Sequence, residues 1–388
     1  MNYNFDEIID RSNSASLKYE KREAIFGTDD VLPMWVADMD FKTPDFVLDA
    51  IRKRIDNPVL GYFYHSKAFY SSIINWMEKR HKWHIEEEWI NFSPGIVTGL
   101  SVIVQAFTNK GDKVIVQPPV YHPFYYVIEN QERIIVGNSL IKKDDQYYMN
   151  FDDLEKKLKE GAAMLILSNP HNPVGRCWTR EELQKLGEMC MKYHCLLVSD
   201  EIHSDLIMTG YHHTPVAGIS DKIAENTITC MAPSKSFNLA GMSSSEIIIS
   251  NSTIRKQLEK HLIDSLHLHL GNTFGDVALE AAYNNGAEWI NELCKYLTGN
   301  VIFAKNFIAT KLTGIRTFRH EGTYLLWVDF SDRGLSHKEL YDLLIYKAGL
   351  GFNDGAIFGK EGENCMRINL ACPKKIVEEA MLRMGKVF

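Results

Sequence analysis

The stretch MAPSKSFNLAGMSS, residues 231–244, directly follows the β-branched run NTITC, residues 226–230. Such a run predicts a buried strand, so Lys235 comes just past the end of a strand. In open α/β sheets, ligands bind outside the carboxyl ends of the strands. A lysine at this point, preceded by Ser234, is therefore a candidate for holding a ligand, provided that the rest of the chain forms such a sheet.

Four other short apolar runs alternate with amphipathic stretches in the middle of the chain. They are rich in Val, Ile and Leu with little alternation, which is typical of strands covered on both faces. Two of the predicted helices begin with capping boxes, Thr179 with Glu182 and Ser336 with Glu339. This alternation predicts the α/β class with a mostly parallel sheet. The four runs are KVIVQ (113–117), AMLILS (163–168), CLLVS (195–199) and EIIIS (246–250).

The length of 388 residues is too great for one hydrophobic core and predicts two domains. Residues 274–312 have an almost wholly helical pattern that could bridge them. The alternating runs TYLLWVDF (323–330) and CMRINLA (365–371) predict a smaller α+β domain. The predicted parts are an N-terminal arm packed on the small domain (1–45), a large domain (46–285) and a small C-terminal domain (286–388).

The composition excludes several classes of function. Lys and Arg number 43 against 50 Asp and Glu, which argues against a nucleic-acid partner and a polybasic membrane surface. No apolar run approaches the roughly 20 residues of a membrane span, and the acidic N-terminus is unlike a signal peptide. The seven scattered cysteines indicate reduced thiols, so we predict a cytoplasmic protein. The 14 histidines lack the spacing of zinc motifs, so no metal site is predicted.

Polar or aromatic side chains follow the predicted parallel strands, and a Ser-Pro-Gly turn (93–95) directly precedes an apolar helix. The first turn of that helix would direct free N–H groups at an anion. Each signal alone is weak, but their joint occurrence at neighbouring strand ends indicates one shared ligand. The residues concerned are Ile96, Val97, Tyr121, Asn172, Asp200, His203, Ser234 and Lys235.

Pyridoxal 5′-phosphate (PLP) is a ligand that satisfies all of these groups. Its aldehyde needs a desolvated lysine amine, for which Lys235 is placed. Its pyridine nitrogen needs a carboxylate, and Asp200 would be costly to bury without such a cation. The face of Tyr121 suits the ring. For the phosphate the candidates are Ile96, Val97 and Ser234, and for the ring hydroxyl they are Asn172 and His203.

Three segments, SNPHNPVGR (168–176), VSDEIHSDL (198–206) and APSKSFNLAG (232–241), resemble fold-type I PLP enzymes of the aminotransferase class I/II superfamily. The resemblance covers essentially the whole chain. Four further segments resemble the MalY/PatB-type cystathionine β-lyases, the C–S lyase branch: LPMWVADMDF (32–41), LGYFYHS (60–66), DEIHSDL (200–206) and MRINLACP (366–373). The implied fold is a large domain with a mostly parallel seven-stranded sheet flanked by helices, plus a smaller α+β domain.

The resemblance also implies roles for individual residues. Lys235 would bind PLP covalently and move the substrate proton, and Arg367 would grip the substrate α-carboxylate as a bidentate fork. From spacing alone, a domain-interface salt bridge is the alternative for Arg367. Tyr62, with Tyr64 as a rival, would reach the phosphate of a neighbouring subunit, which implies a homodimer with shared active sites. The residues implied to line the substrate pocket are Trp35, Ala37, Asp38 and Tyr64.

The implied reaction is an α,β-elimination of L-cystathionine or a related cysteine S-conjugate to a thiol, pyruvate and ammonia, as used in methionine biosynthesis. Many aminotransferases of this fold have an arginine eight residues after the lysine, where this chain has Ser243. The lyase branch tends to lack that arginine, so its absence favours a lyase. Two alternatives stay open: an aminotransferase with the same residues, and a regulatory protein that retains PLP. The family fold also predicts a cis bond at Asn172–Pro173.

Overall fold

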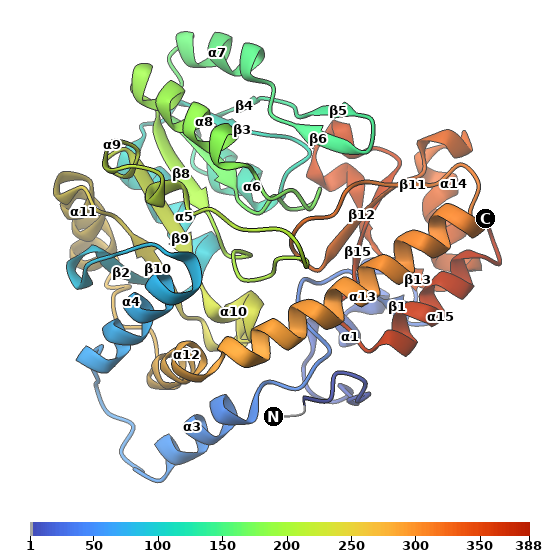
Figure 1. Ribbon diagram of the computed structural model, residues 1–388, viewed down its shortest axis with the longest axis horizontal. Helices are drawn as coiled ribbons and strands as arrows, with labels where there is room; N and C mark the ends of the chain where they lie inside the picture. Colours follow the sequence, from blue (N-terminus) through green and yellow to red (C-terminus); the bar gives the residue numbers. More distant parts are fainter. Residues whose placement is uncertain (1–2) are drawn as a thin grey trace.

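A seven-stranded sheet forms the centre of the larger part of the molecule (Figure 1). This computed structural model describes residues 3–388. Strand β10 runs antiparallel to both of its neighbours, and the other neighbouring strands pair in parallel. The predicted mostly parallel sheet is therefore confirmed, although β2 and β4 were not among the predicted strands. In spatial order the strands are β2 (Ile90–Ser93), β10 (Ser245–Ile248), β9 (Thr227–Met231), β8 (Leu196–Asp200), β7 (Met164–Ser168), β3 (Lys113–Val116) and β4 (Ile134–Gly137).

Helices cover both faces of this sheet, which explains why its strands are apolar throughout. Consecutive residues of β3, Val114 and Ile115, belong to separate hydrophobic clusters because successive side chains point to opposite faces. The cluster around Val114 includes α5 (Ile96–Phe107), α6 (Pro123–Glu129) and α11 (Ser252–Glu259). The cluster around Ile115 includes α7 (Phe151–Lys159), α8 (Arg180–Lys192) and α9 (Asp221–Ala224).

A second, smaller sheet is antiparallel and lies at the far end of the long helix α13 (Figure 1). Helix α12 packs on α3 and α4, and after the break at Gly286 the helix α13 runs from this group toward the small sheet. A Cβ at Gly286 would lie 2.2 Å from the ring of Phe237, so only glycine permits this approach. The helices are α3 (Asp45–Ile55), α4 (Lys67–His81), α12 (Thr273–Asn285), α13 (Ala287–Lys311), α14 (His337–Asp342) and α15 (Lys374–Met384); the strands are β11 (Arg316–Thr317), β12 (Leu325–Asp329), β15 (Cys365–Asn369) and β14 (Asn353–Asp354).

The N-terminal segment lies along strands of the small sheet and its neighbour β13 (Leu350–Gly351). Strand β1 (Leu32–Pro33) pairs in parallel with β13. Further along, the N–H of Asp40 donates to the carbonyl of Ala371 at 2.8 Å. These contacts are of the kind that the predicted arm requires, while the three domain boundaries stay predictions. The remaining short elements are α1 (Leu17–Glu20), α2 (Arg22–Phe26), the hairpin β5 (Ile141–Lys143) with β6 (Gln146–Tyr148), and α10 (Pro233–Ser236).

The predicted capping boxes and the predicted cis peptide bond are confirmed. Both capping boxes form at the starts of α8 and α14. The peptide bond Asn172–Pro173 is cis, as are Asn169–Pro170 and Pro118–Pro119. All seven cysteines are free and buried. Over residues 3–388, no helix has the length and apolar character needed to cross a membrane. The same residues contain no group of three or more His, Cys, Asp or Glu side chains placed to hold a metal ion.

Candidate active site

The carboxyl ends of three adjacent strands meet at one edge of the large sheet. Ser168 at the end of β7 is level with Asp200 at the end of β8, and Asp200 is level with Cys230 of β9. The segments that follow these strands therefore start side by side. Together with the segments after β2 and β3, they place the eight residues named above for a shared ligand around one cavity of about 210 Å³.

Lys235 lies in the first turn after β9, in the short helix α10. The turn is anchored by Ser236, whose hydroxyl donates to the buried carboxylate of Asp205 at 2.7 Å. The Lys235 ammonium donates to the carbonyl oxygen of Ala37 at 2.6 Å. Burial, followed by the nearby Arg367, lowers the pKa of Lys235 to about 8 against the opposing effect of Asp38 and Asp200. A substantial fraction of this amine is therefore neutral near pH 8, as a nucleophile or base requires.

Asp200 is a buried carboxylate without a cation paired to it. Its hydrogen bond comes from the N–H of Ile202 at 3.2 Å, and no ion pair joins it to another of the described residues. Burial raises the pKa of Asp200 to about 7, with the approach of Glu201 adding to the rise and the Ile202 N–H and Lys235 opposing it. A protonated pyridine nitrogen in the cavity would supply the missing cation. This unpaired carboxylate is the first observation that fits PLP.

His203 and Asn172 direct unused polar groups at the same cavity. The Nδ1 of His203 is buried without a hydrogen bond, and burial together with Lys235 and Arg367 holds the pKa of His203 well below its usual range. The imidazole is therefore neutral. The side-chain oxygen of Asn172 accepts from Arg367 at 3.1 Å, while its amide nitrogen makes no hydrogen bond within residues 3–388. These groups fit an oxygen substituent on an aromatic ring that stacks on Tyr121, which also lines the cavity.

The opposite end of the cavity suits an anion. Helix α5 begins at Ile96, and the first-turn N–H groups at Ile96, Val97 and Thr98 have no partner within the helix. Ser243, at the position where an arginine is common, lines the cavity with hydroxyl-bearing neighbours instead of a cation. Sequence reasoning missed Ser244, whose buried hydroxyl has no hydrogen-bond partner. Ser244 could have been found from the sequence, because it directly follows Ser243, which stands in place of the arginine.

Arg367 brings a buried guanidinium from the small domain to the cavity. Its hydrogen-bond acceptors are all neutral: the Asn172 oxygen at 3.1 Å, the Trp35 carbonyl at 2.9 Å and the Asn353 oxygen at 3.2 Å. Its Nε is buried without a partner. Among the described residues it forms no salt bridge, so the domain-interface alternative for this arginine is not what the structure has. A buried cation with a free donor fits a carboxylate ligand.

A larger cavity of about 710 Å³ adjoins the first, and the two share Ala37, Tyr121 and Lys235. Trp35 and Arg367 line it, and its wall is mostly apolar. Sequence reasoning missed His122 in this wall, although the residue directly follows Tyr121. Burial, together with the nearby Arg367, lowers the pKa of His122 to about 4, so this imidazole is neutral near pH 7.

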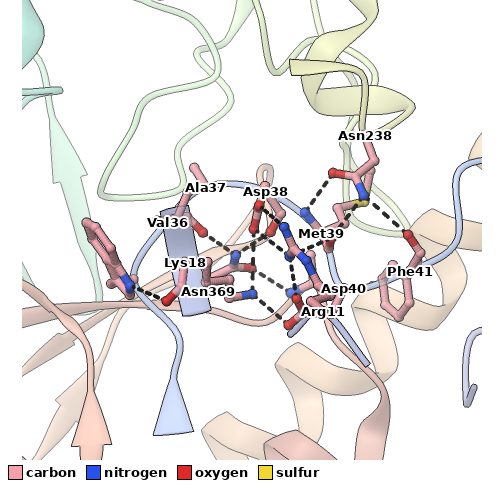
Figure 2. Close-up of polar contacts among 12 residues, drawn as sticks. Arg11, Lys18, Val36, Ala37, Asp38, Met39, Asp40, Phe41, Asn238 and Asn369 are labelled. Carbon is pink, nitrogen blue, oxygen red and sulfur yellow. Dashed lines mark hydrogen bonds and ion pairs between the residues drawn. The ribbon is translucent and has the colours of Figure 1, made fainter. Parts of the chain in front are cut away.

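Three predicted residues lie outside both cavities. Asp38 was predicted to line the substrate pocket, but its carboxylate is held in ion pairs by Arg11 and Lys18 instead (Figure 2). Tyr62 and Tyr64 lie in the connection between α3 and α4, and both side chains are exposed. Their predicted roles concern a neighbouring subunit and stay predictions.

The fold is that of a known class of enzymes. The family described as aminotransferase class I and II matches residues 29–384, so the chain belongs to that family. It is 42% identical to cystathionine β-lyase PatB of Bacillus subtilis over 98% of each chain, and it therefore belongs to the cystathionine β-lyase branch. Cystalysin from Treponema denticola, whose crystal structure contains PLP, is 38% identical with a TM-score of 0.96, covering 100% of this chain and 99% of that one. The PLP-bound C–S lyase from Staphylococcus hominis is 34% identical with a TM-score of 0.92, covering 100% and 98%.

Proposed function

We propose that this chain is a PLP-dependent carbon–sulfur β-lyase. Its substrate would be L-cystathionine or a related cysteine S-conjugate, which it would convert to a thiol (homocysteine from cystathionine), pyruvate and ammonia. The observation that carries the proposal is the partly buried Lys235 amine at the junction of the two cavities, which also contain the unpaired Asp200 and the unpaired donor of Arg367. The names of the related proteins, cystathionine β-lyase and C–S lyase, support the same reaction.

PLP, when bound, supplies an aldehyde that takes up the substrate amino group and a ring that withdraws electrons from the substrate α-carbon. Lys235 would hold the cofactor, and Asp200 would keep its pyridine nitrogen protonated. The first turn of α5 and Ser234 would hold the phosphate. Arg367 would bind the α-carboxylate, which fixes the rotation of the amino acid about its Cα–N bond. Such orientation of the bond to be broken is worth several kcal/mol of the barrier.

The neutral amine of Lys235, once released, would take the proton from the substrate α-carbon as a general base. The electron pair left at Cα would then expel the sulfur from Cβ as a thiolate, and the three-carbon fragment would hydrolyse to pyruvate and ammonia. Because the pKa of Lys235 is about 8, we expect turnover to rise as the pH rises through that value. The larger cavity would hold the departing sulfur substituent.

A homodimer in the cytoplasm is part of the same proposal. Val59, Leu60, Tyr62 and Tyr64 are all exposed in the connection between α3 and α4. A second copy of the chain would cover these residues, and the Tyr62 hydroxyl would bind the phosphate of the PLP held by that copy. The test is complementation between inactive chains: mixing Lys235→Ala with Tyr62→Ala subunits should restore activity, because one site of each hybrid dimer has both residues. No restoration in dimers that exchange subunits would contradict the shared site.

The reaction is tested with purified holoenzyme, L-cystathionine and no keto acid. We expect equal amounts of pyruvate and free thiol, and loss of both after borohydride reduction of the bound cofactor. Amino-group transfer to an added keto acid, without thiol release, would identify an aminotransferase instead. Retained PLP with neither product would favour the regulatory alternative.

A further inference from the structure

Residues 36–41, here called the Ala37 segment, reach the cofactor cavity through Ala37. The segment has no regular secondary structure, yet side chains from distant parts of the chain fix its backbone (Figure 2). The amide nitrogen of Asn369 donates to the carbonyls of Val36 and Asp38, both at 2.6 Å. Asn238, three residues after Lys235, bonds to the N–H and carbonyl of Met39 at 3.0 and 2.9 Å.

The same segment has two carboxylates that face two cations of the N-terminal arm. The Arg11 guanidinium donates to Asp38 at 2.6 Å and to Asp40 at 2.7 Å. The ammonium of Lys18 is 2.6 Å from Asp40 and 3.7 Å from Asp38. The Lys18 side chain is 1% exposed, so this cluster has two positive and two negative charges in a poorly solvated place. Removing one partner of this cluster would therefore change the electrostatic potential well beyond the residues in direct contact with it.

The backbone of Ala37 connects this cluster to the chemistry. Its carbonyl oxygen accepts from Lys235 at 2.6 Å and from the hydroxyl of Tyr324 at 2.8 Å. We propose that Arg11 and Lys18 are positioning residues for Lys235: by neutralising Asp38 and Asp40, they hold the Ala37 segment against Lys235 and limit the negative charge that the nitrogen of Lys235 senses. This inference rests on the proposed function, in which Lys235 binds PLP.

The charges around the Lys235 amine and around the Asp38–Asp40 cluster determine whether a substitution raises or lowers the pKa of the Lys235 nitrogen. The Lys235 amine faces Arg367, Asp38 and Asp200, and the neighbouring His203 is neutral. Tyr19 and Cys372 lie against the carboxylate cluster, and burial raises the pKa of both, so they are neutral near pH 8. Removing a cation from the cluster thus leaves net negative charge near Lys235, and removing a carboxylate leaves net positive charge.

The experiment follows the pH midpoint at which the visible absorption of the Lys235-bound cofactor changes in the holoenzyme. We expect Arg11→Gln to raise this midpoint by about 0.5 unit, because the added negative charge favours the protonated nitrogen. Asp38→Asn should lower it by a similar amount. The pH profile of kcat/KM should move in the same direction in each variant. A purely structural role would not produce shifts of opposite sign.

Arg52→Gln is the matched control, since it removes one exposed guanidinium that pairs with Asp49 on the surface of α3. Its midpoint should equal that of the unchanged protein. Equal midpoints in all three variants, or shifts of the same sign in Arg11→Gln and Asp38→Asn, would overturn the inference. Arg11 is partly exposed, so its substitution tests the idea even if replacement of the buried Lys18 prevents folding. Failure of the unchanged protein to bind PLP would instead overturn the proposed function.

Discussion

The two walls of the cofactor cavity are positioned in different ways. One wall is formed by the ends of β7, β8 and β9, where Asp200 is the last residue of its strand and Asn172 and Lys235 each follow their strand by a few residues. The other wall includes Ala37, whose segment has no regular structure and depends on partners far away in sequence: Arg11 is 27 residues from Asp38, and Asn369 is 333 residues from Val36. The first wall is therefore determined by local pattern and sheet topology, and the second by long-range contacts.

Removing the lysine from the strand-end wall should have the largest effect. We expect Lys235→Ala to lower kcat on the order of 10²- to 10⁴-fold, because both the covalent attachment and the general base are lost. The visible absorption of lysine-bound PLP should disappear with it. Lys222→Ala, which removes an exposed lysine of α9, is the control and should keep full activity. Pyruvate formation within about tenfold of normal in Lys235→Ala would show that another group is the base.

Arg367 connects the strand-end wall to the residue that precedes the Ala37 segment, because it donates both to Asn172 and to the carbonyl of Trp35. We expect Arg367→Met to lower kcat/KM about 10²-fold, mainly through KM, since two charge-assisted hydrogen bonds to the substrate carboxylate are lost. Arg367→Lys should recover part of the loss by keeping the charge without the fork. Steady-state kinetics with cystathionine measures both. An unchanged KM in both variants would mean that the carboxylate binds elsewhere.

This difference between the walls also explains how far the sequence could predict the site. Asp200 and Lys235 were predictable because an apolar run identifies a strand and its carboxyl end is where parallel α/β sheets bind ligands. The ion pairs of Asp38 were not predictable, because no sequence pattern near Asp38 indicates that Arg11 and Lys18 pack against it in the fold. Tyr324 was missed for the same reason, since its role depends on Ala37, 287 residues away.

The fold shows the same contrast on a larger scale. The buried central strands were predicted within one or two residues, because both faces of the sheet need apolar side chains there. Strand β4 (Ile134–Gly137) lies at the sheet edge and is partly exposed, so its pattern did not stand out. Burial explains the miss of β4 but not that of β2 (Ile90–Ser93), which is buried at every residue and lies at the other edge of the sheet.

Asn369→Ala tests the long-range wall directly, without touching the strand ends. The substitution leaves the carbonyls of Val36 and Asp38 without their donor, so we expect the free energy of unfolding to fall by about 2 kcal/mol. We also expect kcat to fall about tenfold, because the Ala37 carbonyl loses its fixed position beside Lys235. Urea denaturation and steady-state kinetics give the two values. A loss of stability with an unchanged kcat would show that the segment needs no such support.

Asn251→Ala should have the smallest effect and shows how the previous result is to be interpreted. Asn251 caps the N-terminus of α11, accepting from the N–H groups of Thr253 and Ile254, and it lines neither cavity. Loss of this cap should lower the free energy of unfolding by about 1 kcal/mol and leave kcat unchanged. Both variants remove an asparagine that holds backbone groups, but only Asn369 holds the segment that faces Lys235. If Asn251→Ala also slowed the reaction, the slow turnover of Asn369→Ala would reflect general loosening of the protein rather than displacement of the Ala37 carbonyl.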